Sequence, residues 1–153
     1  GGGLALATCC DISVASEESE FSLPAVRLGT APAIVLPFVV DAIGAHLARR
    51  YLLTGETLSA EQAKAVHLVH AVTMRAQLSA TVDQFVDHLL QGGPEAITAT
   101  KEFLIESEGQ PLSRSLIEKA ASRAVRNRQC AEAREGIAAF IEDRDPEWRK
   151  KPE

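Results

Sequence analysis

The order of apolar and polar residues separates an opening with short strands from a longer helical part. Residues 4–10 are apolar or small and follow three glycines, which predicts a buried helix. The stretches 11–15 (DISVA) and 21–23 (FSL), in which apolar and polar residues are mixed, flank a charged stretch and predict two extended segments joined by an exposed turn. From Leu36 to Ile141 the apolar positions recur with helical spacing. We therefore predict an α/β fold with a helical tail.

Turn residues mark where the predicted elements begin and end. Pro37 suits a first helical turn, Gly44 suits its exit, and a second helix is expected over 46–53 up to Gly55. The remaining predicted elements are a helix opened by the capping-box pair Ser59 and Gln62, a strand at 66–72, and helices at 78–89, 97–104, 112–125 and 131–141.

We expect one domain that is incomplete at its beginning. The chain has 153 residues, 46% of them hydrophobic, which is enough for one core. No linker divides it. The one compositional shift separates residues 1–35, the end of an α/β core, from the mostly helical residues 36–153. An apolar segment follows the glycines at once, without an initiator methionine, which predicts a fragment cut inside a domain.

Charge and apolar run lengths exclude several classes of function. The formal net charge is -5, whereas a nucleic-acid binder needs clustered Lys and Arg to neutralise phosphates. We expect the basic cluster Arg149–Lys151 to be solvated. No apolar run reaches the roughly 18 residues that span a bilayer, and no signal peptide opens the chain. We expect a cytoplasmic protein, or one of an organellar matrix, that binds neither nucleic acid nor membrane.

The cysteines and histidines do not predict a metal site. Cys9, Cys10 and Cys130 have neither a disulfide framework nor a zinc spacing, and we expect them to be buried reduced thiols. His67 and His70 fall in the predicted strand at 66–72, where a spacing of three points them to opposite faces.

The three opening glycines form the first candidate site. They leave the backbone N–H groups at the positive end of the following helix open to an anionic ligand. An oxyanion developing on a thioester carbonyl would gain about 3 kcal/mol from each preorganised donor. A tight packing contact or a flexible chain end would explain the same triplet.

Four short segments, in order, are spread along nearly the whole chain, from residue 1 to residue 140. They are residues 1–15 (GGGLALATCCDISVA), 21–29 (FSLPAVRLG), 50–63 (RYLLTGETLSAEQA) and 135–140 (EGIAAF). They resemble motifs of the crotonase superfamily, the enoyl-CoA hydratase/isomerase family. The resemblance implies the C-terminal part of a crotonase (ClpP-like) spiral fold with a helical oligomerisation tail. It also implies a protein that stabilises the enolate of an acyl-CoA thioester in an oxyanion hole. Residues 30–40 (TAPAIVLPFVV) resemble the branch with 3-methylglutaconyl-CoA and isohexenylglutaconyl-CoA hydratases.

The resemblance gives roles to individual residues. Gly2 matches the glycine whose N–H is the second oxyanion donor, and the first donor belongs to the N-terminal half, which we expect to be missing. Phe140 matches a phenylalanine that packs near the coenzyme A adenine, often of a neighbouring subunit. Arg144 lies beside Asp143, which stands where relatives carry a lysine, and is our candidate for a coenzyme A contact. Two further candidates for substrate contact are Pro24 and Leu28.

All three positions where the family keeps its catalytic acids are alanine here. The two glutamates of hydratases map to Ala5 and Ala25, and the aspartate of dienoyl isomerases maps to Ala33. A methyl group can neither orient water nor carry a proton. Three explanations stay open: an engineered Glu-to-Ala variant, a natural member whose acid comes from elsewhere (bound bicarbonate included), or a non-catalytic paralogue. The nearby acids are Glu17, Glu18 and Glu20, whose turn pattern predicts solvated side chains.

Two functions from different classes therefore remain. The first is a hydratase or isomerase of a 2-enoyl-CoA, of the methyl- or isohexenylglutaconyl type. The second is a protein that binds acyl-CoA without turnover, or serves as an assembly subunit. The resemblance implies no cofactor besides the coenzyme A thioester itself, and a homotrimer or hexamer, for which the apolar stripes between Ala120 and Ile141 are suited.

Overall fold

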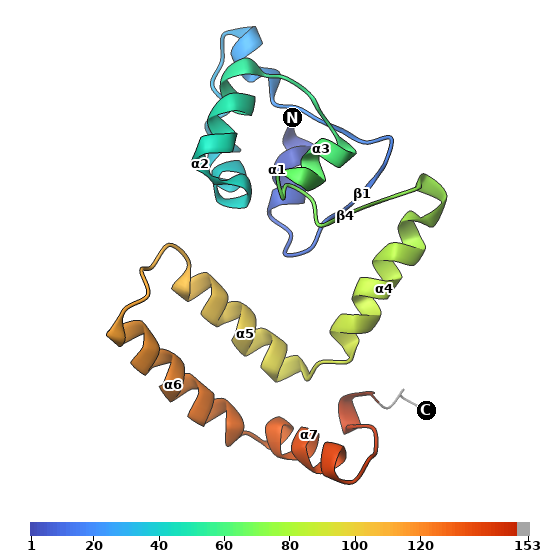
Figure 1. Ribbon diagram of the computed structural model, residues 1–153, viewed down its shortest axis with the longest axis vertical. Coiled ribbons are helices and arrows are strands. Elements are labelled where there is room, and N and C mark those ends of the chain that lie inside the picture. The colour runs from blue at the N-terminus through green and yellow to red at the C-terminus, as the bar shows by residue number, and fades with distance from the viewer. Residues whose placement is uncertain (150–153) are drawn as a thin grey trace. The chain divides into compact units, whose positions relative to one another are not determined.

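The computed structural model describes residues 1–149, which fall into two compact units (Figure 1). The first unit spans Gly1–Asp83 and the second begins at Gln84, so that the boundary lies within α4 (Leu78–Leu90). Short strands occur in the first unit, and the described part of the second is helical. This arrangement agrees with the predicted α/β opening and helical tail.

The first unit combines short strands and helices around one core. Strands β1 and β4 pair in parallel, with Ala15 opposite Val72, and β2 and β3 pair antiparallel, with Phe21 opposite Leu58. The elements in chain order are α1 (Gly2–Thr8), β1 (Val14–Ser16), β2 (Glu20–Phe21), the 3-10 helix η1 (Pro24–Leu28), α2 (Leu36–Thr54), β3 (Leu58–Ser59), α3 (Ala60–Ala65), β4 (Ala71–Thr73) and the 3-10 helix η2 (Arg75–Gln77).

The core of the first unit brings α1 and α2 together. Leu4 of α1 is buried with Val39, Ile43 and Leu52 of α2, and Leu23 before η1 joins the same cluster. Removing these side chains from water is the main force that holds such short elements in place. The predicted helix over 4–10 begins at Gly2 instead, so two of the glycines lie in its first turn.

Glycine interrupts α2 where the sequence predicts a helix end. Gly44 has φ 75° and ψ 153°, so the element consists of two helical stretches with a kink between them. The second stretch ends at Gly55, which is left-handed with φ 62°. Both predicted stops are therefore confirmed, because a residue with a Cβ would be strained at either position.

We expect Gly44→Ala to lower the free energy of unfolding by about 1 to 3 kcal/mol, the usual cost of a side chain in backbone geometry reserved for glycine. The strain would be purely conformational, because a Cβ at Gly44 meets no atom within 4 Å. Denaturant titration measures the change. Gly3→Ala is the matched control, since its site is equally open but helical, and it should be neutral or mildly stabilising. Equal stability of the Gly44→Ala variant and the parent would contradict the prediction.

The predicted capping box at the start of α3 is confirmed. The Ser59 hydroxyl accepts a hydrogen bond from the Gln62 backbone N–H at 3.2 Å. The Gln62 side-chain oxygen accepts one from the Ser59 N–H at 2.9 Å. Two otherwise unpaired backbone donors of the first turn are thereby satisfied.

The predicted strand at 66–72 is wrong for most of its length. Val66 ends α3, His67 has φ 63°, and extended pairing begins only at Ala71. Leu68 and Val69 are both buried although they are adjacent, which an irregular turn allows and an alternating strand does not.

His70 does not occupy a strand face either. The ring Nδ1 of His70 accepts a hydrogen bond from the Ser13 backbone N–H at 3.1 Å, and the backbone N–H of His70 donates to the Ser13 carbonyl at 2.9 Å. The residue therefore fastens the beginning of β1, a structural role that needs no metal.

The second unit contains the three helices predicted over 97–141. They are α5 (Pro94–Ser107), α6 (Arg114–Arg128) and α7 (Ala131–Ile141). The 3-10 helix η3 (Glu147–Arg149), which was not predicted, follows them. α7 has the predicted bounds, whereas α5 begins three residues earlier than predicted, at Pro94.

Two long-range contacts join α7 to its neighbours. The Glu132 carboxylate caps α5 by accepting the N–H groups of Glu95 at 2.9 Å and Ala96 at 2.8 Å. The Trp148 ring lies against Gly136, where an added Cβ would come within 2.8 Å of it. Sequence reasoning missed both contacts, because helix caps are sought in the residues just before a helix, and this cap lies 36 or 37 positions away.

Candidate functional site

The glycine end of α1 is open to a ligand. Gly2 is the first helical residue, and the preceding Gly1 supplies no side-chain cap. The first N–H groups of a helix have no partner within it. A Cβ placed on Gly1, Gly2 or Gly3 would meet no atom within 4 Å, so packing among the described residues does not require these glycines. Of the explanations for the triplet, tight packing within this part of the chain is thus removed.

The same end of α1 lies next to the segment that leads into η1. The Gly1 nitrogen donates to the Ser22 carbonyl at 2.7 Å, and Leu4 and Leu23 share the core. Ser22 is three positions before Ala25. The motif of residues 1–15 and the motif of residues 21–29 therefore lie side by side, as a shared site requires.

The three alanines at the positions predicted for catalytic acids lie in different local structures. Ala5 is half-buried on α1, Ala25 is half-buried in η1, and Ala33 is in an exposed turn before α2. Beside Ala25, Pro24 is exposed and Leu28 exposes 79% of its surface, so apolar side chains border this position.

The nearby acids are exposed, as their turn pattern predicts. Glu18 forms an ion pair with Arg75 at 3.4 Å, and Glu17 precedes it at the surface. Glu20 lines a cavity of about 410 Å³ with Gly1, Gly3 and Ser22. The residues that line this cavity do not include Gly2, Ala5 or Ala25, so it does not connect Glu20 with these residues.

The cysteines and the acidic and imidazole side chains form no metal centre in the part of the chain that is described. The three thiols are free, as predicted. Cys9 and Cys10 are exposed rather than buried, because they lie where α1 ends and the chain turns toward β1.

An ion pair closes the end of α2. Arg50 donates to both carboxylate oxygens of Glu56, at 2.7 and 3.0 Å, and Thr54 donates to Glu56 at 3.1 Å. The hydrogen bond from Arg50 holds the pKa of Glu56 below its ordinary value of 4.5, against a smaller opposing effect of desolvation. The ionised form of Glu56 therefore stabilises the folded state at neutral pH.

We expect Glu56→Gln to destabilise the protein at neutral pH and to matter less as the pH falls. A carboxyl with a lowered folded-state pKa contributes stability above its unfolded pKa and loses it as pH falls through the folded value. Denaturation midpoints of parent and variant should thus converge as the pH falls below about 4.5, the ordinary value of this carboxyl. Glu17→Gln, at an exposed position of the same unit, is the control for the loss of one surface charge. A constant difference at all pH values would contradict the prediction.

The two residues of the second unit that are predicted to contact coenzyme A differ in whether their side chains already have protein partners. Phe140 exposes 87% of its surface and Ile141 beside it 75%. Arg144 instead binds Glu135 through two hydrogen bonds at 2.6 and 2.9 Å and Glu142 at 2.6 Å. These carboxylates raise the pKa of the guanidinium, and a phosphate would have to displace them. Phe140 is accessible to a partner, whereas Arg144 is already engaged.

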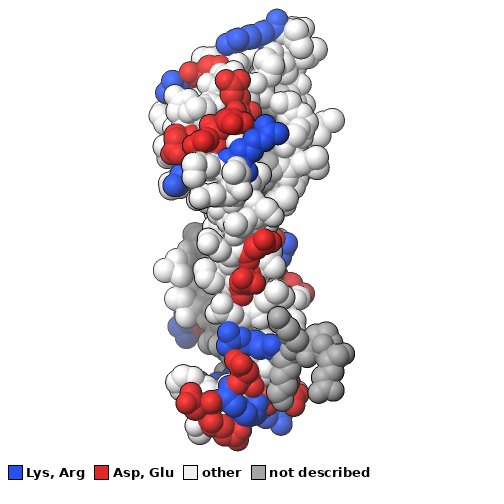
Figure 2. All heavy atoms as spheres, turned by 90° about the vertical axis from the view of Figure 1, so that its right-hand side faces the viewer, with Lys and Arg blue, Asp and Glu red and all other residues white. Residues whose placement is uncertain are grey.

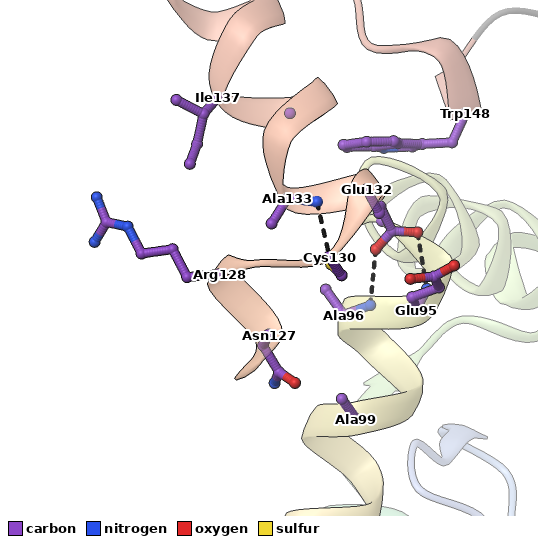
Figure 3. A pocket seen from close by; sticks show the side chains of 12 residues that line it. Glu95, Ala96, Ala99, Asn127, Arg128, Cys130, Glu132, Ala133, Ile137 and Trp148 are labelled. Atoms are coloured by element: carbon purple, nitrogen blue, oxygen red, sulfur yellow. Dashed lines mark hydrogen bonds between the residues drawn. The ribbon is translucent and has the colours of Figure 1, made fainter. Parts of the chain in front are cut away.

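A second cavity, of about 520 Å³, lies between α5 and α7 (Figure 3). Figure 3 shows the Glu132 carboxylate turned toward the start of α5 and the Trp148 ring over α7. Both oxygens of Glu132 and the Trp148 indole N–H already have protein partners. These two side chains are thus used by the fold, while the polar side chains of Glu95, Asn127 and Arg128 also line the cavity.

The surface charge agrees with the composition. Acidic and basic side chains are intermixed on the face that Figure 2 displays, without a continuous basic track across it. Arg149 is exposed as expected, and the rest of its cluster, Lys150 and Lys151, lies outside the described residues. In the described part of the chain, every helix is too short or too polar to cross a membrane.

Comparison with known proteins identifies the class. The family model for enoyl-CoA hydratase/isomerase matches residues 1–151. Mevalonyl-coenzyme A hydratase of Aspergillus fumigatus is 32% identical over 154 residues, covering 97% of this chain and 56% of that protein. 2,3-Dehydroadipyl-CoA hydratase of Escherichia coli is 31% identical over 152 residues, covering 97% and 58%. An enoyl-CoA hydratase of Shewanella pealeana superimposes with a TM-score of 0.91 at 35% identity, covering 97% of this chain and 55% of that one.

Fold and motifs together define a protein of the crotonase class. The chain belongs to the enoyl-CoA hydratase/isomerase family. It spans somewhat more than half the length of the relatives that it matches. Enoyl-CoA hydratases act on a coenzyme A thioester and need no cofactor beyond it.

Proposed function

We propose that the whole protein binds an acyl-CoA thioester and stabilises its enolate, with the Gly2 N–H as one donor of an oxyanion hole. The observation that carries this proposal is the open glycine end of α1, where no side chain separates the backbone N–H groups from solvent. A developing oxyanion is the species that such donors favour, because preorganised N–H groups stabilise charge that appears during the reaction.

We infer a hydratase or isomerase of a 2-enoyl-CoA as the reaction. The family of the chain supports this inference, and residues 30–40 favour a methyl- or isohexenylglutaconyl-type acyl group. Pro24 and Leu28 would contact the acyl group, since both are exposed beside Ala25. The proton carrier would come from outside Ala5, Ala25 and Ala33, because methyl groups do not exchange protons.

Acyl-CoA binding without turnover is the second candidate function, and the three alanines favour it.

Assembly into an oligomer is proposed for either function. Phe140, Ile141 and the 44%-exposed Ile137 give α7 an apolar face that a homotrimer or hexamer would cover. In such an assembly Phe140 would lie near the coenzyme A adenine of a neighbouring subunit. We place the protein in the cytoplasm or an organellar matrix.

Acetoacetyl-CoA tests the oxyanion site without requiring turnover. Its β-keto thioester ionises to an enolate with its own ultraviolet absorption, and a site with oxyanion donors should bind that form preferentially. We expect the whole protein to increase the enolate absorption in a saturable titration, while free coenzyme A does not. Binding of acetoacetyl-CoA without any gain in enolate absorption would refute the proposed site.

A further inference from the structure

The peptide of residue 25 is held firmly within its turn. Both the backbone N–H and the hydroxyl of Thr30 donate to the Ala25 carbonyl, each at 3.1 Å. Gly29 between them is left-handed, with φ 71°, which lets the chain close on this carbonyl. These two hydrogen bonds fix the conformation of the turn at residues 25–30.

Arg27 attaches the turn to the end of α2. Its Nε donates to the Thr54 carbonyl at 3.2 Å. Next to that carbonyl, Gly55 is buried, and a Cβ there would come within 3.2 Å of both the Pro24 Cα and the Arg27 Nε. The two segments thus approach so closely that an added Cβ would force them to move apart by a few tenths of an ångström.

The partner of Arg27 is itself immobilised. The single proton of the Thr54 hydroxyl is shared between the Arg50 carbonyl at 2.8 Å and the Glu56 carboxylate at 3.1 Å, and the Glu56 N–H donates to that hydroxyl at 3.2 Å. The Arg50–Glu56 ion pair described above closes the same corner. Because α2 also shares its core with Leu4 of α1, this corner is fixed relative to the glycine end of α1.

We propose that Arg27 is a positioning residue, which sets the place of residue 25 relative to Gly2 by tying η1 to Thr54. The inference rests on the proposed function, because that distance matters only where a ligand lies between the two residues. A guanidinium suits the task, since its Nε–H has a fixed direction and its charge strengthens the hydrogen bond to a carbonyl.

Kinetics in a background that carries the missing acid tests the role. In the whole protein with Ala25→Glu, adding Arg27→Met, which removes the donor and keeps an unbranched side chain, should lower kcat about tenfold or more and leave KM within about twofold, since small misplacement of a catalytic group costs rate rather than affinity. Arg27→Lys should recover most of kcat, because an ammonium can still donate to the Thr54 carbonyl. Unchanged kcat in the Met variant, or equal losses in Met and Lys, would overturn the proposal.

Hydrogen exchange provides a readout that does not depend on activity. With Ala25 in place, Arg27→Met should speed exchange of the Thr30 N–H, which bonds to the Ala25 carbonyl, by about tenfold. Exchange of the Gln62 N–H, held by the capping box, should stay the same. Equal acceleration at both amides would mean a general loss of stability and would refute the positioning role. If Ala25→Glu brings no hydration, the proposed function fails at that position, and exchange alone decides about Arg27.

Discussion

Ala25→Glu in the whole protein should increase hydration of a 2-enoyl-CoA by about 10² to 10⁴-fold over the parent, the usual contribution of a positioned general acid or base. Ala25 is half-buried in η1, its carbonyl is held by Thr30, and η1 is tied to α2, so a carboxylate there would start from a defined backbone position. Hydration is followed by loss of the enoyl thioester absorption, with crotonyl-CoA as a first substrate.

Ala25→Gln is the matched control for this gain. It has nearly the size and hydrogen-bonding capacity of glutamate but cannot accept a proton at neutral pH, so it should stay near the parent rate. A carboxylate in this role also predicts a rate that falls at acid pH in the Glu variant. If acyl-CoA still binds and the Glu variant gains nothing, position 25 is not a vacated hydratase site.

Gly2→Pro should weaken enolate stabilisation by about 10² to 10³-fold, the usual cost of removing one oxyanion donor. Proline lacks the N–H but is well tolerated as the first residue of a helix, which is the position of Gly2 in α1. The space around Gly2 is open, so the ring meets no described atom near the Cβ. The measurement is the enolate absorption of bound acetoacetyl-CoA.

Gly2→Ala separates the donor from the glycine. It adds a Cβ where nothing lies within 4 Å and keeps the N–H, so it should retain enolate absorption. Thermal unfolding of both variants establishes that α1 is intact. Enolate absorption that stays at the parent level in both variants would show that the Gly2 N–H is not a donor. Similar losses in both would show that the glycine is needed for ligand clearance instead.

The family and most elements could be predicted from local sequence. Gly44, Gly55 and the Ser59–Gln62 pair act through their own backbone and nearest neighbours, and each produced the expected stop or cap. The order of four motifs identified the family because each carries several residues at fixed spacing. The predicted bounds of an element were wrong where contacts with residues far along the chain determine the local structure. This is the case at 66–72, where Leu68 and Val69 are both buried in one turn.

The sequence by itself determined that residues 5, 25 and 33 cannot transfer protons, because a methyl group is inert in any fold. Only the tertiary structure decided how the site is held. The Arg27–Thr54 hydrogen bond joins residues 27 positions apart, and Arg144 is drawn to Glu135 rather than left free. Such contacts depend on packing between elements, which brings distant donors and acceptors within 3 Å or so, and no local pattern of residues encodes that distance.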